Sequence, residues 1–457
     1  MIRLKETILA IALALAAWTV ITLPAGMTPD QGLTFGIVLL TLSLWGTGLV
    51  PGYVASTFLF VSLILTGLST PQEAFSSFSS SAIWLVVAGF VIGAAITHSG
   101  LGVRIGALAR PHLSKSYAAL IAGLMVLGMA LGFVMPSSLG RAAVLVPVGM
   151  ALASSLGLEK DTLGRTGVAV IIAIGTNMPS FAILPSNIPN IIFSGVAEQS
   201  LGVQFSYADY LMLHYPILGV LKSVFIVGLV LYFFPARVSA ASDEPAMTSL
   251  PSRSQLALLA ILMVTLGLWS TDQIHGINAA WVGLTTSLVL MIPKLGFVPP
   301  PIFKSSVDFS MILFVAGALT LGTVVNASGL GNIIAHAVLQ MLPFQEGRDF
   351  LNFISLSLLG ISTSIFTTSP GMPAVLVPLA PELAQTTDFS LSAVLMTQVI
   401  GFSTILLPYQ VGPLIVAMGL AGESTRPLLK VTLSLFVLTL LVLVPLDFLW
   451  WKILGQI

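Results

Sequence analysis

An eight-residue phrase occurs twice in this chain, and it constrains the fold more than any other feature of the sequence. Residues 140–147 read Gly-Arg-Ala-Ala-Val-Leu-Val-Pro and residues 371–378 read Gly-Met-Pro-Ala-Val-Leu-Val-Pro, so that six of eight positions match across 231 residues. Residues 82–102 also align without a gap to residues 311–331, and both stretches end in Ser-Gly-Leu-Gly. One half of the chain is therefore a diverged copy of the other.

The composition restricts both halves to a membrane. Hydrophobic residues make up 56% of the chain and charged residues 7%, whereas charged residues are about a quarter of a soluble domain. Because only helices and closed barrels span a bilayer, and because at least ten apolar runs are long enough to do so as helices, we predict an all-α polytopic membrane protein. The chain has no cysteine and a net charge of zero, which excludes thiol chemistry and gives no sign of a nucleic-acid partner.

Lysine and arginine alternate between successive loops in a way that orients the predicted spans, since basic residues mark cytoplasmic loops. Thirteen of the seventeen basic residues fall on one side if the two repeated segments return to the side from which they enter. The thirteen are Arg3, Lys5, Arg104, Arg110, Lys115, Lys160, Arg165, Arg237, Arg253, Lys294, Lys304, Arg426 and Lys430. The pattern predicts a cytoplasmic amino terminus and a carboxyl terminus outside.

The two segments that return, about residues 117–157 and 350–385, are predicted to be re-entrant helical hairpins. The first enters from the cytoplasm and the second from outside, as in the inverted repeats of many transporters. The predicted domains are a first inverted repeat over residues 1–240, a cytoplasmic linker over 241–254 and a second inverted repeat over 255–457.

Polar residues, prolines and glycines interrupt the apolar sequence at four corresponding places. Two are the hairpin tips, residues 136–140 and 367–371, and two lie in predicted broken spans over about 166–196 and 391–420. Backbone that leaves a helix inside a bilayer is tolerated where it lines a cavity, so the four breaks predict a central binding site. The alternative is a set of kinks in which Ser and Thr cap the freed carbonyls.

Arg141 carries the most specific information in the first tip. A charge near the bilayer centre costs at least ~2.5–3.5 kcal/mol, so it usually faces a cavity or a partner. Arg141 also begins the second arm of its hairpin, where a helix amino terminus favours an anion. The guanidinium and the helix amino terminus together indicate that the ligand is a carboxylate, a sulfate or a similar oxyanion. The alternatives are that Arg141 pairs with a carboxylate of the protein or that its side chain reaches the cytoplasm. The counterpart of Arg141 in the second copy is Met372.

Other ionisable residues in apolar surroundings are less informative. Lys222 falls in the middle of a span predicted over residues 211–234. Its open roles are pairing with another residue, reaching toward the interface and contributing to transport, and we expect a structural role. His98 and Asp308 fall near predicted span ends, where we expect them to lie at the interface rather than to carry protons.

With these motifs the chain resembles the divalent anion:sodium symporter family, within the wider ion-transporter superfamily. Tips of that family carry Ser-Asn-Thr, small residues and Leu-x-Pro, and residues 137–139 and 368–370 fall at Ser-Asn-Thr. Residues 185–187 are similar to its Pro-Pro-Asn, and residues 411–413 lie near its second broken span. The resemblance implies about eleven spans and a homodimer in which a transport domain moves as an elevator against a scaffold.

Neither tip has the Asn or the third-place Thr that help to bind sodium and carboxylate in the family. The coupling ion, Na⁺ or H⁺, is therefore open, as is exchange without one, and no other cofactor or metal is expected. One hypothesis is that Arg141 supplies the positive charge that sodium provides in relatives.

We predict a secondary active transporter for a small anion (di- or tricarboxylate, sulfate or a related oxyanion) in the inner membrane, with the lipid bilayer as its surroundings. The predicted substrate-binding residues are Ser137, Ser138, Arg141, Asn187, Thr368, Ser369 and Gln410. The predicted cation-binding residues are Ser137, Ser138, Gly175, Thr176, Asn177, Thr368, Ser369 and Ser403. An anion channel is the first alternative. A membrane-embedded enzyme is disfavoured because the spans have no His or carboxylate cluster able to act as acid and base.

Overall fold

The computed structural model describes residues 2–239, 252–345 and 347–457, and all regular secondary structure in these ranges is helical. The first half contains α1 (Ile2–Thr22), α2 (Pro29–Thr47), α3 (Gly52–Leu65), α4 (Pro71–Ala74), α5 (Ser81–His98), α6 (Leu101–Leu113), α7 (Tyr117–Val134), α8 (Ser138–Ser155), α9 (Leu163–Gly175), α10 (Ile188–Leu201), α11 (Tyr207–His214) and α12 (Lys222–Phe233). The predicted all-α fold class is confirmed.

The second half also alternates long and short helices. It contains α13 (Arg253–Ser270), α14 (Asp272–His275), α15 (Ala279–Met291), α16 (Pro300–Ser306), α17 (Phe309–Ala327), α18 (Leu330–Met341), α19 (Asp349–Thr367), α20 (Met372–Leu376), α21 (Ala380–Thr387), α22 (Leu391–Ser403), α23 (Gly412–Leu420), α24 (Arg426–Leu438) and α25 (Val444–Ile453). The predicted linker over residues 241–254 lies outside the described residues as far as residue 251.

Nine helical segments of the described ranges are long and apolar enough to cross a membrane. Two of them are compound. A π-helical turn, Tyr215–Leu221, joins α11 to α12, and a second one, Thr439–Leu443, joins α24 to α25. The nine include the arms α7, α8 and α19 of the predicted hairpins and leave out shorter apolar helices such as α3 and α15. The number of about eleven membrane spans therefore stays a prediction.

Long helices of similar apolar character occupy different positions in the fold. In α5, 67% of the residues in its most apolar stretch are buried, whereas in α1 the buried share is 17%. The central helix α5 packs against α10 and α15. By contrast, α1 packs on α2 and leaves Ile11, Trp18 and Ile21 exposed, as a lipid-facing helix does. The core that positions the site is therefore built around α5 and the helices that cover it.

One glutamine from each half caps a helix of the other half. The helices α2 and α13 both begin with a capping box, whose residues at the third helical position are Gln31 and Gln255. Nε2 of Gln31 donates a hydrogen bond to the carbonyl oxygen of Ser328 (3.0 Å), and Nε2 of Gln255 donates one to that of Ser99 (2.9 Å). Both serines begin a copy of Ser-Gly-Leu-Gly. The contacts are thus reciprocal, as an inverted repeat would make them, although the repeat itself stays a prediction.

Glycine is needed at the two glycine positions of Ser-Gly-Leu-Gly for different physical reasons. Gly100 and Gly329 precede α6 and α18 with φ of 68° and 70°, a left-handed conformation that glycine adopts without strain. The second glycine lets each short helix approach the second arm of its hairpin. A Cβ atom at Gly102 would lie 2.2 Å from Cγ1 of Val144, and one at Gly331 would lie 3.1 Å from a backbone oxygen in the second phrase.

Both hairpins rest on the broken span that follows them. A Cβ atom at Gly128 of α7 would lie 2.6 Å from the carbonyl oxygen of Gly175, at the end of α9. In the second half, a Cβ atom at Gly360 of α19 would lie 3.0 Å from Cα of Gly401 in α22. Backbone-to-backbone contacts of this kind need small residues, as in other membrane helix pairs. Each tip is therefore held against the interrupted part of the next span.

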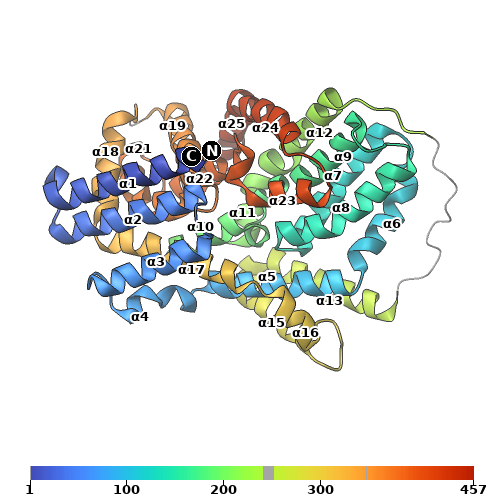
Figure 1. Cartoon of the computed structure of the whole chain (residues 1–457), viewed down its shortest axis with the longest axis horizontal. Coiled ribbons are helices and arrows are strands. Elements are labelled where there is room, and N and C mark those ends of the chain that lie inside the picture. Colours follow the sequence, from blue (N-terminus) through green and yellow to red (C-terminus); the bar gives the residue numbers. More distant parts are fainter. Residues whose placement is uncertain (1, 240–251, 346) are drawn as a thin grey trace.

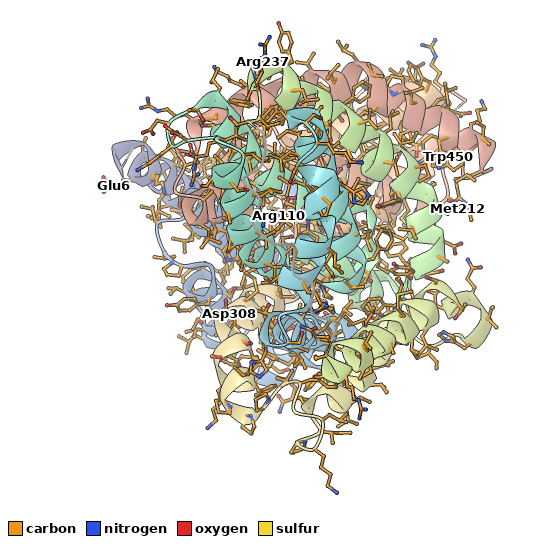
Figure 2. The ribbon with its side chains drawn as sticks, turned by 90° about the vertical axis from the view of Figure 1, so that its right-hand side faces the viewer. Glu6, Arg110, Met212, Arg237, Asp308 and Trp450 are labelled. Atoms are coloured by element: carbon orange, nitrogen blue, oxygen red, sulfur yellow. The ribbon has the colours of Figure 1, made fainter. Side chains whose placement is uncertain are left out.

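Figure 1 shows α6–α9 on one side of the molecule and α18, α19 and α21 on the other, with α11 and α23 between them. The two broken spans meet in this central region, because the ring of Phe402 in α22 contacts those of Phe181 and Phe193, at centroid distances of 6.0 and 5.9 Å. Figure 2 shows Glu6 and Trp450, near the two ends of the chain, at opposite sides of the molecule. Which end is cytoplasmic stays a prediction.

Candidate functional site

A cavity of about 200 Å³ lies where both hairpin tips and both broken spans meet. Residues 136–139 of the first tip and 187–189 of the first broken span form part of its wall. The second half contributes Pro370 from its tip and residues 411–413 from its broken span. Residues of α5 and α17 close the cavity from the other side. The four polar breaks of the sequence thus converge on one space.

Three helices begin at this cavity, and their first residues line it: Ser138 of α8, Ile188 of α10 and Gly412 of α23. The first backbone N–H groups of a helix have no partner within the helix, and the helix dipole makes this end positive. Ser137 and Asn187 cap two of these helices by accepting hydrogen bonds at 3.1 Å. The cavity wall therefore carries partial positive charge, which favours an anion.

The structure brings three of the seven predicted substrate-binding residues to the cavity wall. Ser137, Ser138 and Asn187 line the cavity. The four that do not belong to its lining are Arg141, Thr368, Ser369 and Gln410. The first half therefore meets the cavity with polar side chains, and the second half meets it mainly with prolines and backbone.

The polar side chains of the second tip are used to hold the break between α22 and α23. Oγ of Ser369 donates a hydrogen bond to the carbonyl oxygen of Phe402 (2.5 Å), and its N–H donates to that of Gln410 (3.1 Å). Oε1 of Gln410 accepts from the N–H groups of Leu406 and Leu407 at 2.9 and 2.8 Å. These bonds satisfy backbone groups that have left the helix. Ser369 and Gln410 are thus occupied by the protein itself.

Arg141 is fully buried behind the first tip, at 0% exposure, and all three of its nitrogens donate to the protein. Nε donates to the carbonyl oxygen of Thr176 (2.8 Å), and Nη2 donates to Oγ of Ser138 (2.9 Å). Nη1 donates to the carbonyl oxygen of Met135 and to the carbonyl oxygen and Oγ of Ser186, the latter two at 3.1 and 3.0 Å. Within the described ranges no carboxylate lies at ion-pair distance from this guanidinium. Its charge is hydrogen-bonded but not neutralised.

The predicted cation-binding residues of the two broken spans lie at the carboxyl ends of α9 and α22. The carbonyl oxygen of Thr176 accepts from Arg141, and that of Ser403 accepts from Nζ of Lys222 (2.7 Å). Asn177 is completely buried, and neither atom of its side-chain amide has a hydrogen-bond partner among the described residues. Gly175 carries no side chain and provides the close contact with α7. Both helix ends therefore meet a cationic side chain.

Asp308 is the one acidic residue in the cavity lining. Its side chain caps α17, because Oδ1 accepts from the N–H groups of Ser310 and Met311 at 2.9 and 3.2 Å. The side chain is exposed, as expected from its predicted place at a span end. Within the described ranges no group of three or more His, Asp or Glu side chains is arranged to hold a metal ion.

Sequence reasoning missed Ser186 and the cavity-facing prolines of the second half. Ser186 lies inside the Pro-Ser-Asn motif that the sequence analysis identified, but only the neighbouring Asn187 was predicted to be a binding residue. Oγ of Ser186 also donates to the carbonyl oxygen of Gly132 in α7 (2.6 Å), which ties the first broken span to its hairpin. Nothing in the local sequence distinguishes a proline that faces a cavity from one that ends a helix.

Several known proteins are similar to this chain over most of its length. A chloroplastic dicarboxylate transporter 2.2 of Arabidopsis thaliana is 25% identical over 452 residues, which covers 93% of this chain and 81% of the relative. An L-tartrate/succinate antiporter of Shigella dysenteriae serotype 1 is 24% identical over 360 residues, 74% of this chain and 72% of the relative.

The crystal structure of the YdaH transporter of Alcanivorax borkumensis matches the fold with a TM-score of 0.57, at 15% identity, over 93% of this chain and 99% of that one. The sequence model of the family described as "Sodium:sulfate symporter transmembrane region" matches residues 3–457. Because this match extends over essentially the whole chain, the protein belongs to the sodium:sulfate symporter transmembrane region family, as the resemblance of its tips and broken spans predicted.

Proposed function

We propose that this protein is a secondary active transporter that carries a small anion through the central cavity by alternating access. The family and the relatives are membrane transporters and not enzymes, which confirms the prediction that the chain has no enzymatic activity. The named relatives transport dicarboxylates, so a small dicarboxylate is the first substrate class to test. Tricarboxylate and sulfate follow as the related anions.

The observation that carries the proposal is the charge around the cavity. Three helices begin at the wall of one small space, so the positive ends of their dipoles meet there, and behind it lies a buried guanidinium that has no carboxylate at ion-pair distance within the described residues. A positive charge costs several kcal/mol in a low-dielectric interior unless an anion compensates it. A bound carboxylate or sulfate would supply that compensation. A cavity for a cation or a neutral solute would not need this arrangement.

Arg141 acts on the anion through Ser138 rather than by direct contact. Nη2 of Arg141 donates to Oγ of Ser138, and Ser138 lines the cavity at the first turn of α8. With its oxygen held by the guanidinium, the hydroxyl is left to donate its proton toward the ligand. The charge also reaches the cavity through a medium that screens it less than water does. Arg141 is therefore a positioning residue, and the residues that contact the anion are Ser137, Ser138 and Asn187.

A charge that is part of the protein changes how transport can be coupled. A coupling ion leaves the empty carrier, but the guanidinium of Arg141 stays in it and is then uncompensated inside the bilayer. Moving the loaded carrier is therefore easier than moving the empty one. This favours exchange of one anion for another over net uptake.

The decisive experiment is uptake of radiolabelled succinate, with sulfate and citrate as competitors, into proteoliposomes that contain the purified protein. We expect saturable uptake that is stimulated by unlabelled succinate inside the vesicles. Arg141→Ala and Ser138→Ala should weaken the apparent affinity by about tenfold or more, because a hydrogen bond to a charged group contributes ~1.5–3 kcal/mol. Arg237→Ala, which removes an exposed arginine that does not belong to the cavity lining, is the matched control.

Two results would overturn the proposal. An unchanged affinity in Arg141→Ala protein that still unfolds at a normal temperature would remove the role of the charge. Anion currents far above carrier turnover, without stimulation from the opposite side, would instead identify a channel.

The remaining expectations come from the family and extend the same proposal. We propose a homodimer in the bacterial inner membrane, with the amino terminus in the cytoplasm and the carboxyl terminus outside. The tips and broken spans would move as an elevator domain against a scaffold. Accessibility of single cysteines introduced near Glu6 and Trp450, which the natural chain without cysteines permits, would measure the orientation directly.

A further inference from the structure

A second buried cation lies at the end of the other broken span. Lys222 has 1% exposure within the span Tyr207–Phe233, and its Nζ donates to the carbonyl oxygen of Ser403 (2.7 Å). Ser403 is the last residue of α22, where carbonyl groups lack partners within the helix and the dipole is negative. The ammonium group therefore occupies a position that suits a cation.

Asp447 is the acidic counterpart of Lys222. It is completely buried in the span Arg426–Ile453, and neither of its carboxylate oxygens has a hydrogen-bond partner in the described structure. Lys222 directly follows the π-helical turn of its span, Asp447 lies within one helical turn after that of its own span, and the two π-helical turns contact each other. Turns of this type inside α-helices are frequent at functional sites.

Sodium does not fit the two helix ends as they are built. In transporters with discontinuous helices, the carboxyl ends of half-helices coordinate Na⁺, and here these ends are Thr176 and Ser403. Their carbonyl oxygens already accept hydrogen bonds from Arg141 and Lys222. A sodium ion that shared either oxygen would lie against a positive charge. Within the described residues, Oδ1 of Asn177 beside the first end has no hydrogen-bond partner, and this one oxygen does not by itself make a site for a hard cation.

We propose that Lys222 is a tethered cation that fills the second cation position of the carrier, with Asp447 as its fixed counter-charge. Together with Arg141 at the first position, it replaces sodium, and transport runs without that ion. This inference rests on the proposed transport function, and it assigns to Lys222 a role that the family's sodium would otherwise have. Lys222 does not contact the transported anion.

The test compares wild-type protein and Lys222→Met in NaCl and in choline chloride at equal ionic strength. We expect the wild-type unfolding temperature and its rate of succinate exchange to be the same in both salts. Lys222→Met frees the carbonyl oxygen of Ser403 and leaves Asp447 unneutralised, so it should unfold at a lower temperature in choline, and NaCl should restore at least half of that loss. Its exchange rate should rise at least threefold with sodium.

Two further variants keep the test decisive. Lys222→Met/Asp447→Asn removes both charges and should fold even if the single variant does not, with sodium stabilisation reduced relative to Lys222→Met. Lys294→Met removes an exposed lysine and should behave as wild type in both salts.

Stabilisation or activation of the wild type by sodium over choline would overturn the inference, and so would a Lys222→Met protein that responds to sodium no more than the wild type does. Failure of the proposed function would look different. Succinate would then not be exchanged by any variant in either salt, while the unfolding temperatures would still report whether sodium binds.

Discussion

The two halves place a cation at the end of their broken helix by different means. In the first half, Arg141 of the repeated phrase reaches the carboxyl end of α9 directly. Its counterpart Met372 is equally buried and fills the corresponding place in the second half, where a Cβ atom at Gly401 would lie 2.7 Å from Cε of Met372. The end of α22 takes its cation from Lys222, on another helix.

Both helix ends therefore meet a cationic side chain, although the two copies of the repeated phrase differ at the position of Arg141. The predicted duplication would supply two corresponding helix ends, and each end needs a positive partner because its carbonyl groups are buried. The partner can come from the hairpin or from a neighbouring span, provided that it reaches the same carbonyl oxygen. Where two copies differ at one position, the compensating residue is therefore found in space rather than in the alignment.

The largest effect is expected when an arginine is placed in the second copy of the repeated phrase, at the position that corresponds to Arg141. Met372→Arg introduces a second buried cation near the end of α22, to which Lys222 already donates, and should lower stability by at least ~2.5 kcal/mol. If the end of α22 needs only one cation, Met372→Arg/Lys222→Met should be less destabilised than the sum of the single variants, by roughly 0.5–3 kcal/mol. Unfolding temperatures of the four proteins in detergent measure this coupling, and strict additivity would contradict the equivalence of the two cations.

The glycines under the two hairpins test whether the halves are packed alike. Gly128→Ala and Gly401→Ala each place a Cβ atom less than 3.0 Å from backbone atoms of the adjoining helix. Each should cost ~1–3 kcal/mol, since neither backbone can move freely. Gly267→Ala is the control, because nothing lies within 4 Å of a Cβ atom there, and it should be stabilising by up to about 1 kcal/mol. A large loss in one half alone would show that only one hairpin rests firmly on its broken span.

The two tips differ in backbone strain. Thr368 has φ of 70° and ψ of 162°, a region that is essentially restricted to glycine, whereas Ser137 at the corresponding place has φ of −121°. Thr368→Gly should therefore raise the unfolding temperature, by a net gain of about 1 kcal/mol after the entropy cost of glycine. Ser137→Gly removes the N-cap of α8 and should lower stability by a few tenths of a kcal/mol. Opposite signs are expected, and a loss in both variants would mean that the threonine side chain is needed.

Sequence patterns predicted the fold class and the four breaks because these depend on local composition. A bilayer forces apolar runs into helices, and Pro, Gly and hydroxyl residues inside such runs mark the interruptions. The predicted contacts between Ser137, Ser138 and the cavity follow from their place at a helix start. The family match over residues 3–457 agrees with the resemblance of these motifs.

The details of the site could not be predicted because they depend on which partner a side chain meets across the fold. Gln410 and Ser369 have the chemistry of ligand-binding residues, yet their hydrogen bonds go to backbone groups of the second break. The pairing of Lys222 with Ser403 joins residues 181 positions apart and leaves no local signal. Sequence reasoning gave Lys222 a structural role, and its place at a helix end supports the sharper proposal above.

The smallest expected effect concerns the first turn of the matching helices α5 and α17. Ser80 caps α5 with a hydroxyl, whereas Asp308 caps α17 with a carboxylate that faces the cavity. Asp308→Ser would make the halves alike, since serine keeps the cap and removes a negative charge from the wall of the proposed anion site. The apparent affinity for succinate should rise about twofold at low salt and less at high salt, because exposed charges contribute under ~1 kcal/mol and are screened. Asp308→Asn should give the same rise, and an effect that did not weaken with salt would show that the carboxylate acts by contact instead of by its charge.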